Sequence, residues 1–346
     1  LLVMDYSQDG SDGGKFTPAQ IAQINNSGKD AIAYISIGEA ENYRYYWDTA
    51  WNTFTPPWLG PVNPDWPGNY KVKFWDPAWQ NIIFDYLDTI INQGFDGIYL
   101  DIIDAYYYWM VDNPVEPLAD SLMIQFVINI RAHVDSSTGT FYIIPQNGEE
   151  IINSTNVSPP LKAAYFNAIN AIGVEDVFFP GDSAENNPYN PDNFRIADLQ
   201  EFLSNQKQVF SIDYLTDPTK IQQYITEASA QNFIPYVCMR ALDILCSGIT
   251  TGIDQSMINP YVSVMIFPNP ASDYAEITFT SSSLQNFDLN IYSLSGKLIK
   301  RAKTNNYDNL INNVYLLDIS DLENGFYLVE IKSDIYKKFV KLIVNK

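Results

Sequence analysis

Two acidic residues of this sequence directly follow apolar segments, a position in which a carboxyl group can do chemistry. Asp101 follows GIYL within the segment GFDGIYLDIIDAY, and Glu175 follows AIGV. Cleavage of a glycosidic bond needs one carboxyl group that protonates the leaving oxygen and a second that attacks the anomeric carbon or activates water. A carboxyl group among apolar residues tends to keep its proton, whereas one with polar neighbours tends to stay ionised. We therefore predict Glu175 as the general acid and Asp101 as the nucleophile or base.

Each of these two assignments has an alternative among nearby residues. Asp101 could instead cap the turn that follows it, which would leave Asp104 as the chemical group. Asp176 and Glu39 compete with Glu175 for the role of the acid. Backbones two strands apart in a sheet are separated by roughly 10 Å, and their side chains can meet at either the retaining or the inverting distance. The stereochemical outcome therefore stays open.

Further polar and aromatic residues are predicted to bind a sugar substrate. Sugar rings stack on aromatic side chains because their axial C–H groups form an apolar face. Trp47 and Trp109 lie in the tyrosine-rich stretches NYRYYWD and AYYYWM and are the predicted stacking residues. Arg44, in the first stretch, could bind a substrate hydroxyl or pair with Glu39 or Glu41. The polar residues at the other strand ends complete the predicted substrate site: Asp5, Tyr6, Glu39, Asp104, Gln146, Asn147, Asp213, Tyr214 and Arg240.

The composition excludes several other kinds of active site. The chain has one histidine, His133, and two cysteines, so a serine–histidine hydrolase, a histidine-ligated metal centre and a zinc–cysteine cluster all lack their parts. The sequence indicates no cofactor and no metal, since the DGSDGG loop at 9–14 lacks the spacing of a calcium loop. The net charge of −21 argues against nucleic acid and anionic membrane as partners. No apolar run reaches the roughly 18 residues of a membrane span.

Eight apolar segments with polar ends are predicted as strands. Most are continuous rather than alternating, which is typical of parallel strands covered on both faces. Helical patterns lie between most of them; one begins with Asp76 as N-cap and Pro77, and ends at Gly94. This order predicts an α/β fold, a closed (β/α)8 TIM barrel over residues 1–247. The predicted strands are 1–7, 31–39, 70–76, 97–104, 141–149, 171–179, 208–215 and 233–240.

The last part of the chain has a different pattern. Through Thr250 the chain has 31 acidic and 11 basic residues, and beyond it 10 and 9. Segments such as YAEITFT and GFYLVEIK alternate polar and apolar residues and are separated by turn signals such as SLSG and LENG. We predict a linker at 248–261 and a small all-β sandwich at 262–346. Cys238 and Cys246, near the boundary, could form a disulfide or could be two small buried apolar residues.

The motifs of the first part together resemble glycoside hydrolase family 114, the endo-α-1,4-polygalactosaminidase group. They are YISIGEAENYRYYW, WLGPVNPDWPGNYKVKFWDPAW, GFDGIYLDIIDAY, IIPQNGEE and VEDVFF, in this order. The resemblance implies a TIM barrel, no metal, and a carboxylate pair that maps onto Asp101 and Glu175. Family members have a further strand upstream, with a Trp or Tyr followed by Gln-Leu, so the numbering of the barrel strands is open.

The tail resembles the C-terminal sorting domain of the type IX secretion system, through FPNPASDYAEITF, LNIYSLSGKLIK and the terminal KLIVNK. This resemblance implies export by the type IX secretion machinery to the medium or the cell surface; the alternative is an accessory sandwich that binds carbohydrate. For the whole chain we expect a secreted glycoside hydrolase that cleaves an amino-sugar polysaccharide resembling α-1,4-polygalactosamine. Such a cationic polymer would suit an acidic barrel. The alternative is a surface barrel that binds carbohydrate without cleaving it.

Overall fold

The structure is a computed structural model, and the described part of the chain forms two compact units. It comprises residues 1–137, 139–242, 245–246, 264–279, 288–293, 297–303, 310–311, 314–332 and 337–346. The predicted linker at 248–261 lies outside these residues. The first unit consists of Leu1–Ser183, Asn187–Asp213 and Gln223–Tyr236, and the second of Ala184–Asn186, Tyr214–Gln222 and Val237–Lys346.

The strands of the α/β part are neighbours in chain order. β1 (Leu2–Met4), β2 (Ala31–Ser36), β6 (Gly97–Asp101) and β7 (Tyr142–Pro145) form one parallel sheet. A second sheet has the order β10 (Ile234–Cys238), β9 (Gln208–Tyr214), β8 (Ala171–Glu175). A parallel bridge between Gln146 and Gly173 joins β7 to β8. This is the architecture of an α/β barrel, as predicted, although among the described residues no pairing between β1 and β10 closes it.

The segment 70–76, predicted as the third barrel strand, is not part of the parallel sheets, and that prediction was wrong. β5 (Asn69–Val72) instead pairs antiparallel with β3 (Glu39–Glu41) and β4 (Leu59–Val62) in a separate small sheet. β2 therefore pairs directly with β6. The sequence YKVKFWD alternates lysine with apolar residues, a pattern typical of an antiparallel strand with one covered face rather than of a buried parallel strand.

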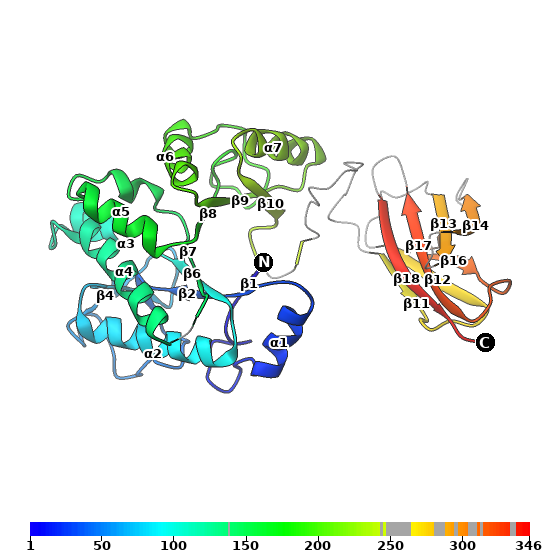
Figure 1. Ribbon diagram of the computed structural model, residues 1–346, viewed down its shortest axis with the longest axis horizontal. Coiled ribbons are helices and arrows are strands. Elements are labelled where there is room, and N and C mark those ends of the chain that lie inside the picture. The colour runs from blue at the N-terminus through cyan, green and yellow to red at the C-terminus, as the bar shows by residue number, and fades with distance from the viewer. Residues whose placement is uncertain are drawn as a thin grey trace. The chain divides into compact units, whose positions relative to one another are not determined.

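Helices connect the parallel strands and show the expected signals at their ends. α2 (Pro77–Gln93) begins after Asp76, whose carboxylate accepts the N–H of Ala78 at 2.8 Å, and ends at Gly94 with a φ of 85°. α1 packs on α2, α2 on α4 and α4 on α5, on the outside of the strands (Figure 1). None of the described helices is long and apolar enough to cross a membrane. The other helices are α1 (Pro18–Asn26), α3 (Ala105–Tyr107), a π-helix (Tyr108–Asp112), α4 (Ala119–Ser137), a 3₁₀ helix (Glu149–Asn153), α5 (Pro159–Ala168), α6 (Asn193–Ser204) and α7 (Pro218–Ala230).

The C-terminal part is an antiparallel β-sandwich, as predicted (Figure 1). Alternate residues of both sheets, among them Ile277, Leu289 and Val329, are fully buried in one apolar core. Cys238 and Cys246 form a disulfide. One sheet has the order β11 (Val264–Phe267), β12 (Tyr274–Phe279), β16 (Val314–Asp318), β15 (Leu310–Ile311), and the other β14 (Leu298–Lys303), β13 (Asp288–Ser293), β17 (Gly325–Lys332), β18 (Lys337–Val344).

Candidate active site

Asp101 is held at the carboxyl end of β6 by two hydrogen bonds. Its Oδ2 accepts the hydroxyl of Tyr34 on β2 at 2.7 Å, and its Oδ1 accepts the backbone N–H of Ile102 at 2.8 Å. Ile102 has a φ of 61°, a strained conformation for a β-branched residue. Gly38 permits this turn, because a Cβ at that position would lie 2.2 Å from the carbonyl oxygen of Ile102. The backbone is therefore shaped to orient the Asp101 carboxylate.

The charge state of Asp101 follows from its surroundings. Burial raises the pKa of Asp101 to about 6, against the opposing effect of the hydrogen bonds from Tyr34 and Ile102. The negative charges of Glu175 and Asp104 raise this pKa further. Asp101 is therefore more buried than its predicted polar neighbours implied, but at pH 7 its carboxylate is still largely ionised, a state that suits a nucleophile or a base. The effect of Glu175 on this pKa supports the prediction that the two carboxyl groups belong to one site.

Glu175, at the carboxyl end of β8, is bound reciprocally by Asn147. The Nδ2 of Asn147 donates to Glu175 Oε1 at 3.1 Å, and the backbone N–H of Glu175 donates to Asn147 Oδ1 at 3.1 Å. Asn147 has a φ of 54°, a conformation that asparagine tolerates better than most residues. Its own backbone N–H donates to the carbonyl of Gly173 at 2.8 Å. These bonds connect the ends of β7 and β8, beside the parallel bridge between Gln146 and Gly173.

Tyr99 fills the space between the strands that carry the two carboxyl groups. It lies two residues before Asp101 and therefore on the same face of β6. Its hydroxyl donates to Gln146 Oε1, and a Cβ on Gly173 would lie 1.8 Å from that hydroxyl oxygen. Burial, and then the charges of Glu175 and Asp101, raise the pKa of Tyr99. Gln146 is buried as the partner of Tyr99, and its contact with substrate stays a prediction.

Acidic residues also gather beside Asp101. Loss of hydration, followed by the charges of Glu150 and Glu39, raises the pKa of Asp104. The buried Glu39 accepts a hydrogen bond from Asn63 at 2.9 Å and lies 3.5 Å from Lys71 Nζ. Within the described ranges, no three acidic, histidine or cysteine side chains are arranged to hold a metal ion. Asp104 thus makes the surroundings of Asp101 acidic, Glu39 acts in turn on Asp104, and the contact of both with substrate stays a prediction.

Arg44 and Tyr6 are internal. Of the two alternatives for Arg44, the structure shows the pairing with Glu41, and the burial of Tyr6 corrects the expectation that it faces the substrate. The buried Arg44 guanidinium pairs with Asp5 and with Glu41, each at 2.6 Å. The ring centre of Tyr43 lies 4.9 Å from it. Tyr6 is fully buried and donates its hydroxyl to the carbonyl of Gly10 at 2.8 Å. A buried guanidinium with two carboxylate partners has little capacity left for a substrate hydroxyl, and removal of either partner would leave a buried charge unpaired.

The predicted aromatic residues fall into two groups. Trp109 is 1% exposed and donates its indole N–H to the carbonyl of Val72 at 2.8 Å, so we withdraw it from the stacking residues. Trp47 is partly exposed, its ring centre 4.8 Å from that of Tyr70, and it remains a proposed stacking residue.

Tyr214 and Arg240, both predicted to bind substrate, interact with each other. The guanidinium of Arg240 lies 4.1 Å from the centre of the buried Tyr214 ring. Its Nε donates to the carbonyl of Ala184 at 3.1 Å. These contacts give both side chains partners within the protein, and their contact with substrate stays a prediction.

Asp213 has a structural role in place of the predicted contact with substrate. It is fully buried, and its two oxygens accept the backbone N–H groups of Phe179 at 3.0 Å and Phe178 at 3.4 Å. Burial raises its pKa to about 7, and these two hydrogen bonds oppose the shift. Asp213 therefore shapes the loop that follows Glu175.

We expect the stability of the first unit to depend on pH through Asp213. The pKa rises from an ordinary 3.8 to about 7 on folding, so the folded state binds more protons between these values. Stability is then lost as the pH rises from about 4 to about 7, by up to roughly 4 kcal/mol. Asp213→Asn should remove this slope. All seven tryptophans lie between Trp47 and Trp109, so tryptophan fluorescence in urea reports this unit. Parallel pH curves for the variant and the wild type would contradict the prediction.

Three further residues of the site, Tyr34, Tyr99 and Arg195, were absent from the sequence-based prediction. Tyr34 and Tyr99 had a usable signal: each is a tyrosine inside an apolar strand, two residues before the strand's last residue, and the two are paired across β2 and β6. Arg195 had none. It is a helical arginine whose partners Glu175, Asn147 and Glu149 lie 20 to 48 residues away.

Two solved structures share the fold. The glycoside hydrolase domain of PelA from Pseudomonas aeruginosa matches with a TM-score of 0.52 at 17% identity, over 71% of this chain and 89% of that one. Ega3 from Aspergillus fumigatus, solved in complex with galactosamine, matches with a TM-score of 0.51 at 20% identity, over 65% and 81%. These likenesses establish that residues of the first part adopt a TIM-barrel fold, while function has to be argued from the site.

Sequence relatives cover the same part of the chain. An uncharacterized protein of Methanocaldococcus jannaschii is 40% identical over 255 residues, which are 71% of this chain and 72% of that protein. One of Deinococcus radiodurans is 38% identical over 250 residues, 71% and 74%. Residues 265–345 match the secretion system C-terminal sorting domain, which makes this a secreted or surface protein. Residues 3–254 match the model of GH114, and the chain therefore belongs to glycoside hydrolase family GH114.

Proposed function

We propose that this protein hydrolyses an amino-sugar polysaccharide, an α-1,4-linked galactosamine polymer, with Asp101 and Glu175 as its catalytic residues. The observation that carries the proposal is the pair itself: two carboxyl groups at the carboxyl ends of β6 and β8, each oriented by its own hydrogen bonds, with the charge of Glu175 raising the pKa of Asp101. Membership of GH114 supports the reaction class. The galactosamine bound to Ega3 and the charge of −20 through Thr250 (11 basic against 31 acidic residues) support a cationic sugar.

The two carboxyl groups have distinct parts in this reaction. Glu175 donates its proton to the leaving oxygen as the bond from that oxygen to the anomeric carbon breaks. Asp101 supplies an electron pair to the anomeric carbon, directly or through a water molecule that it deprotonates. Tyr34 and Ile102 keep Asp101 ionised and oriented by donating to its two oxygens.

The test measures new reducing ends after the full chain is incubated with α-1,4-linked galactosamine polymer, in its free-amine and its N-acetylated forms. We expect release from the free-amine form. Saturable binding without new reducing ends, even after long incubation, would show that the protein binds the glycan without hydrolysing it. Absence of both binding and cleavage would show that the substrate is a different polysaccharide.

The rate on this substrate should report the ionisation of Asp101. We expect kcat/KM to fall as the pH drops below about 6, because the protonated carboxyl group has lost its nucleophilic electron pair. Tyr34→Phe removes a hydrogen bond that favours the charged form, and a bond to a charged group contributes about 1.5 kcal/mol or more. The acid limb of the profile should then move to higher pH by about one unit. An unchanged limb would show that another group controls it.

A further inference from the structure

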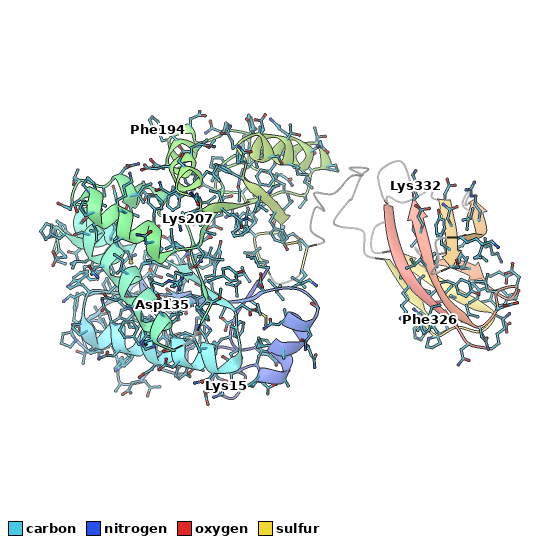
Figure 2. All side chains as sticks on the ribbon, viewed as in Figure 1. Lys15, Asp135, Phe194, Lys207, Phe326 and Lys332 are labelled. Atoms are coloured by element: carbon cyan, nitrogen blue, oxygen red, sulfur yellow. A yellow bond between two sulfur atoms is a disulfide. The ribbon has the colours of Figure 1, made fainter. Side chains whose placement is uncertain are left out.

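Arg195, on α6, contacts the surroundings of Glu175 with three of its donor groups. Its Nε donates to Glu149 Oε1, its Nη1 to the backbone carbonyl of Glu175 at 2.9 Å, and its Nη2 to Asn147 Oδ1 at 3.2 Å. The neighbouring Phe194 is 88% exposed and points to solvent (Figure 2). The helix thus turns Arg195 inward, towards the ends of β7 and β8.

The orientation of the Asn147 amide follows from these contacts. Two N–H groups meet at its Oδ1, one from the backbone of Glu175 at 3.1 Å and one from Arg195 at 3.2 Å. An NH₂ group at that position would face both donors, so the amide oxygen has to lie there. The Nδ2 is consequently directed to Glu175 Oε1, at 3.1 Å.

This orientation also fixes the carboxyl group of Glu175. Its Oε1 accepts the N–H of Asn147 at 3.1 Å, and its backbone carbonyl accepts the Nη1 of Arg195 at 2.9 Å. We propose that Arg195 is the positioning residue of the general acid: it fixes the Asn147 amide, which in turn orients the carboxyl group that carries the transferable proton. The proton passes from the Glu175 carboxyl group to the leaving oxygen, which retains the electron pair of the broken bond. This inference rests on the proposed role of Glu175.

Arg195 acts in this arrangement through its geometry more than through its charge. The buried Glu149 pairs with the guanidinium and offsets its positive charge. Lysine would keep the charge but lacks the planar fork that reaches Glu149, the Glu175 carbonyl and Asn147 together. The wild type and Arg195→Lys should therefore differ in rate although their net charges are equal.

The chain contains a matched control at the opposite ends of the same two strands. Arg131, on α4, donates to the carbonyls of Ala168 at 2.9 Å and Phe141 at 3.0 Å and to Asn170 Oδ1 at 2.8 Å. Phe141 and Asn170 directly precede β7 and β8, and Ala168 lies just before Asn170 at the end of α5, whereas the partners of Arg195 end or follow these strands. Arg131→Gln thus removes a similar set of bonds far from the carboxyl groups.

The experiment measures the kinetics of the full chain on two substrates. One is the galactosamine polymer, and the other is a dinitrophenyl glycoside of a galactosamine oligomer, whose leaving group needs no proton. For Arg195→Gln we expect kcat on the polymer to fall about 10²-fold with KM within about threefold, and cleavage of the dinitrophenyl glycoside to change less than fivefold. The kcat of Arg195→Lys on the polymer should be as low as that of Arg195→Gln. Guanidinium chloride in solution should restore part of the kcat of Arg195→Gln. Arg131→Gln should lower the unfolding midpoint by a similar amount but leave kcat unchanged.

Equal losses on both substrates, or a loss with Arg131→Gln as large as with Arg195→Gln, would overturn the inference and make Arg195 a structural residue. Glu175→Gln separates this failure from that of the proposed function. If Glu175→Gln still cleaves the dinitrophenyl glycoside and Arg195→Gln does not, only the role of Arg195 is wrong. If Glu175→Gln itself fails to distinguish the substrates, the assignment of the acid is wrong.

Discussion

Asp101→Asn should lower kcat/KM on the galactosamine polymer by about 10³-fold or more, at any pH. The amide retains the shape of the carboxylate, and its oxygen can still accept the N–H of Ile102. It lacks the electron pair that attacks the anomeric carbon or deprotonates water. Release of reducing ends, measured against the wild type at equal concentration, is the direct test.

The same variant should be more stable than the wild type at pH 7. Burial raises the pKa of Asp101 from 3.8 to about 6, so the folded protein carries an unfavourable ionised group above that pH, which the neutral amide removes. A higher urea midpoint by tryptophan fluorescence together with lost activity would separate chemistry from folding. Asp104→Asn is the informative comparison. If it abolishes hydrolysis and Asp101→Asn does not, Asp104 is the chemical group and Asp101 serves the turn.

Glu175→Gln should have the second large effect, and that effect should depend on the leaving group. On the polymer we expect a loss of about 10³-fold, because a sugar oxygen leaves poorly unless it is protonated. On the dinitrophenyl glycoside the loss should be less than tenfold, since that leaving group departs as a stable anion. Kinetics on both substrates check this result.

Two rivals to Glu175 can be tested in the same assay. Asp176→Asn alters a neighbour of Glu175 whose φ is 55°, and Glu39→Gln alters the buried partner of Asn63. Neither should distinguish the two substrates. If a variant at either position loses activity on the polymer but keeps activity on the dinitrophenyl glycoside, that residue is the general acid. Glu175 would then be a neighbour of the site.

Part of the candidate site could be predicted because its signals are local. An apolar run that ends in a carboxylate, as in GIYLD and AIGVE, marks the carboxyl end of a parallel strand, and β6 and β8 end at Asp101 and Glu175. Helix signals are equally local, and α2 begins after Asp76 and ends before Gly94 as the residues predict. The change of periodicity near residue 250 likewise indicated the β-sandwich.

Other parts depended on which segments meet across the chain. Asp213, Arg44 and Trp109 have the residue types of a sugar site, but the structure buries all three with internal partners. Nothing in their local sequence distinguishes a carboxylate that binds a sugar from one that binds the N–H groups of Phe178 and Phe179. The partners of Asp213 and Trp109 lie more than 30 residues away, and Arg44 pairs with the distant Asp5 as well as with the nearby Glu41.

The sequence by itself therefore determined most of the order of strands and helices, the C-terminal β-sandwich and the strand ends that carry Asp101 and Glu175. These properties follow from periodicity and from short-range rules of capping and burial. Tertiary structure alone decided which strands 69–72 pairs with, that Tyr34 donates to Asp101 and that Arg195 reaches Asn147. Pairing across the fold depends on how distant segments compete for the same partners, and a local pattern carries no record of that competition.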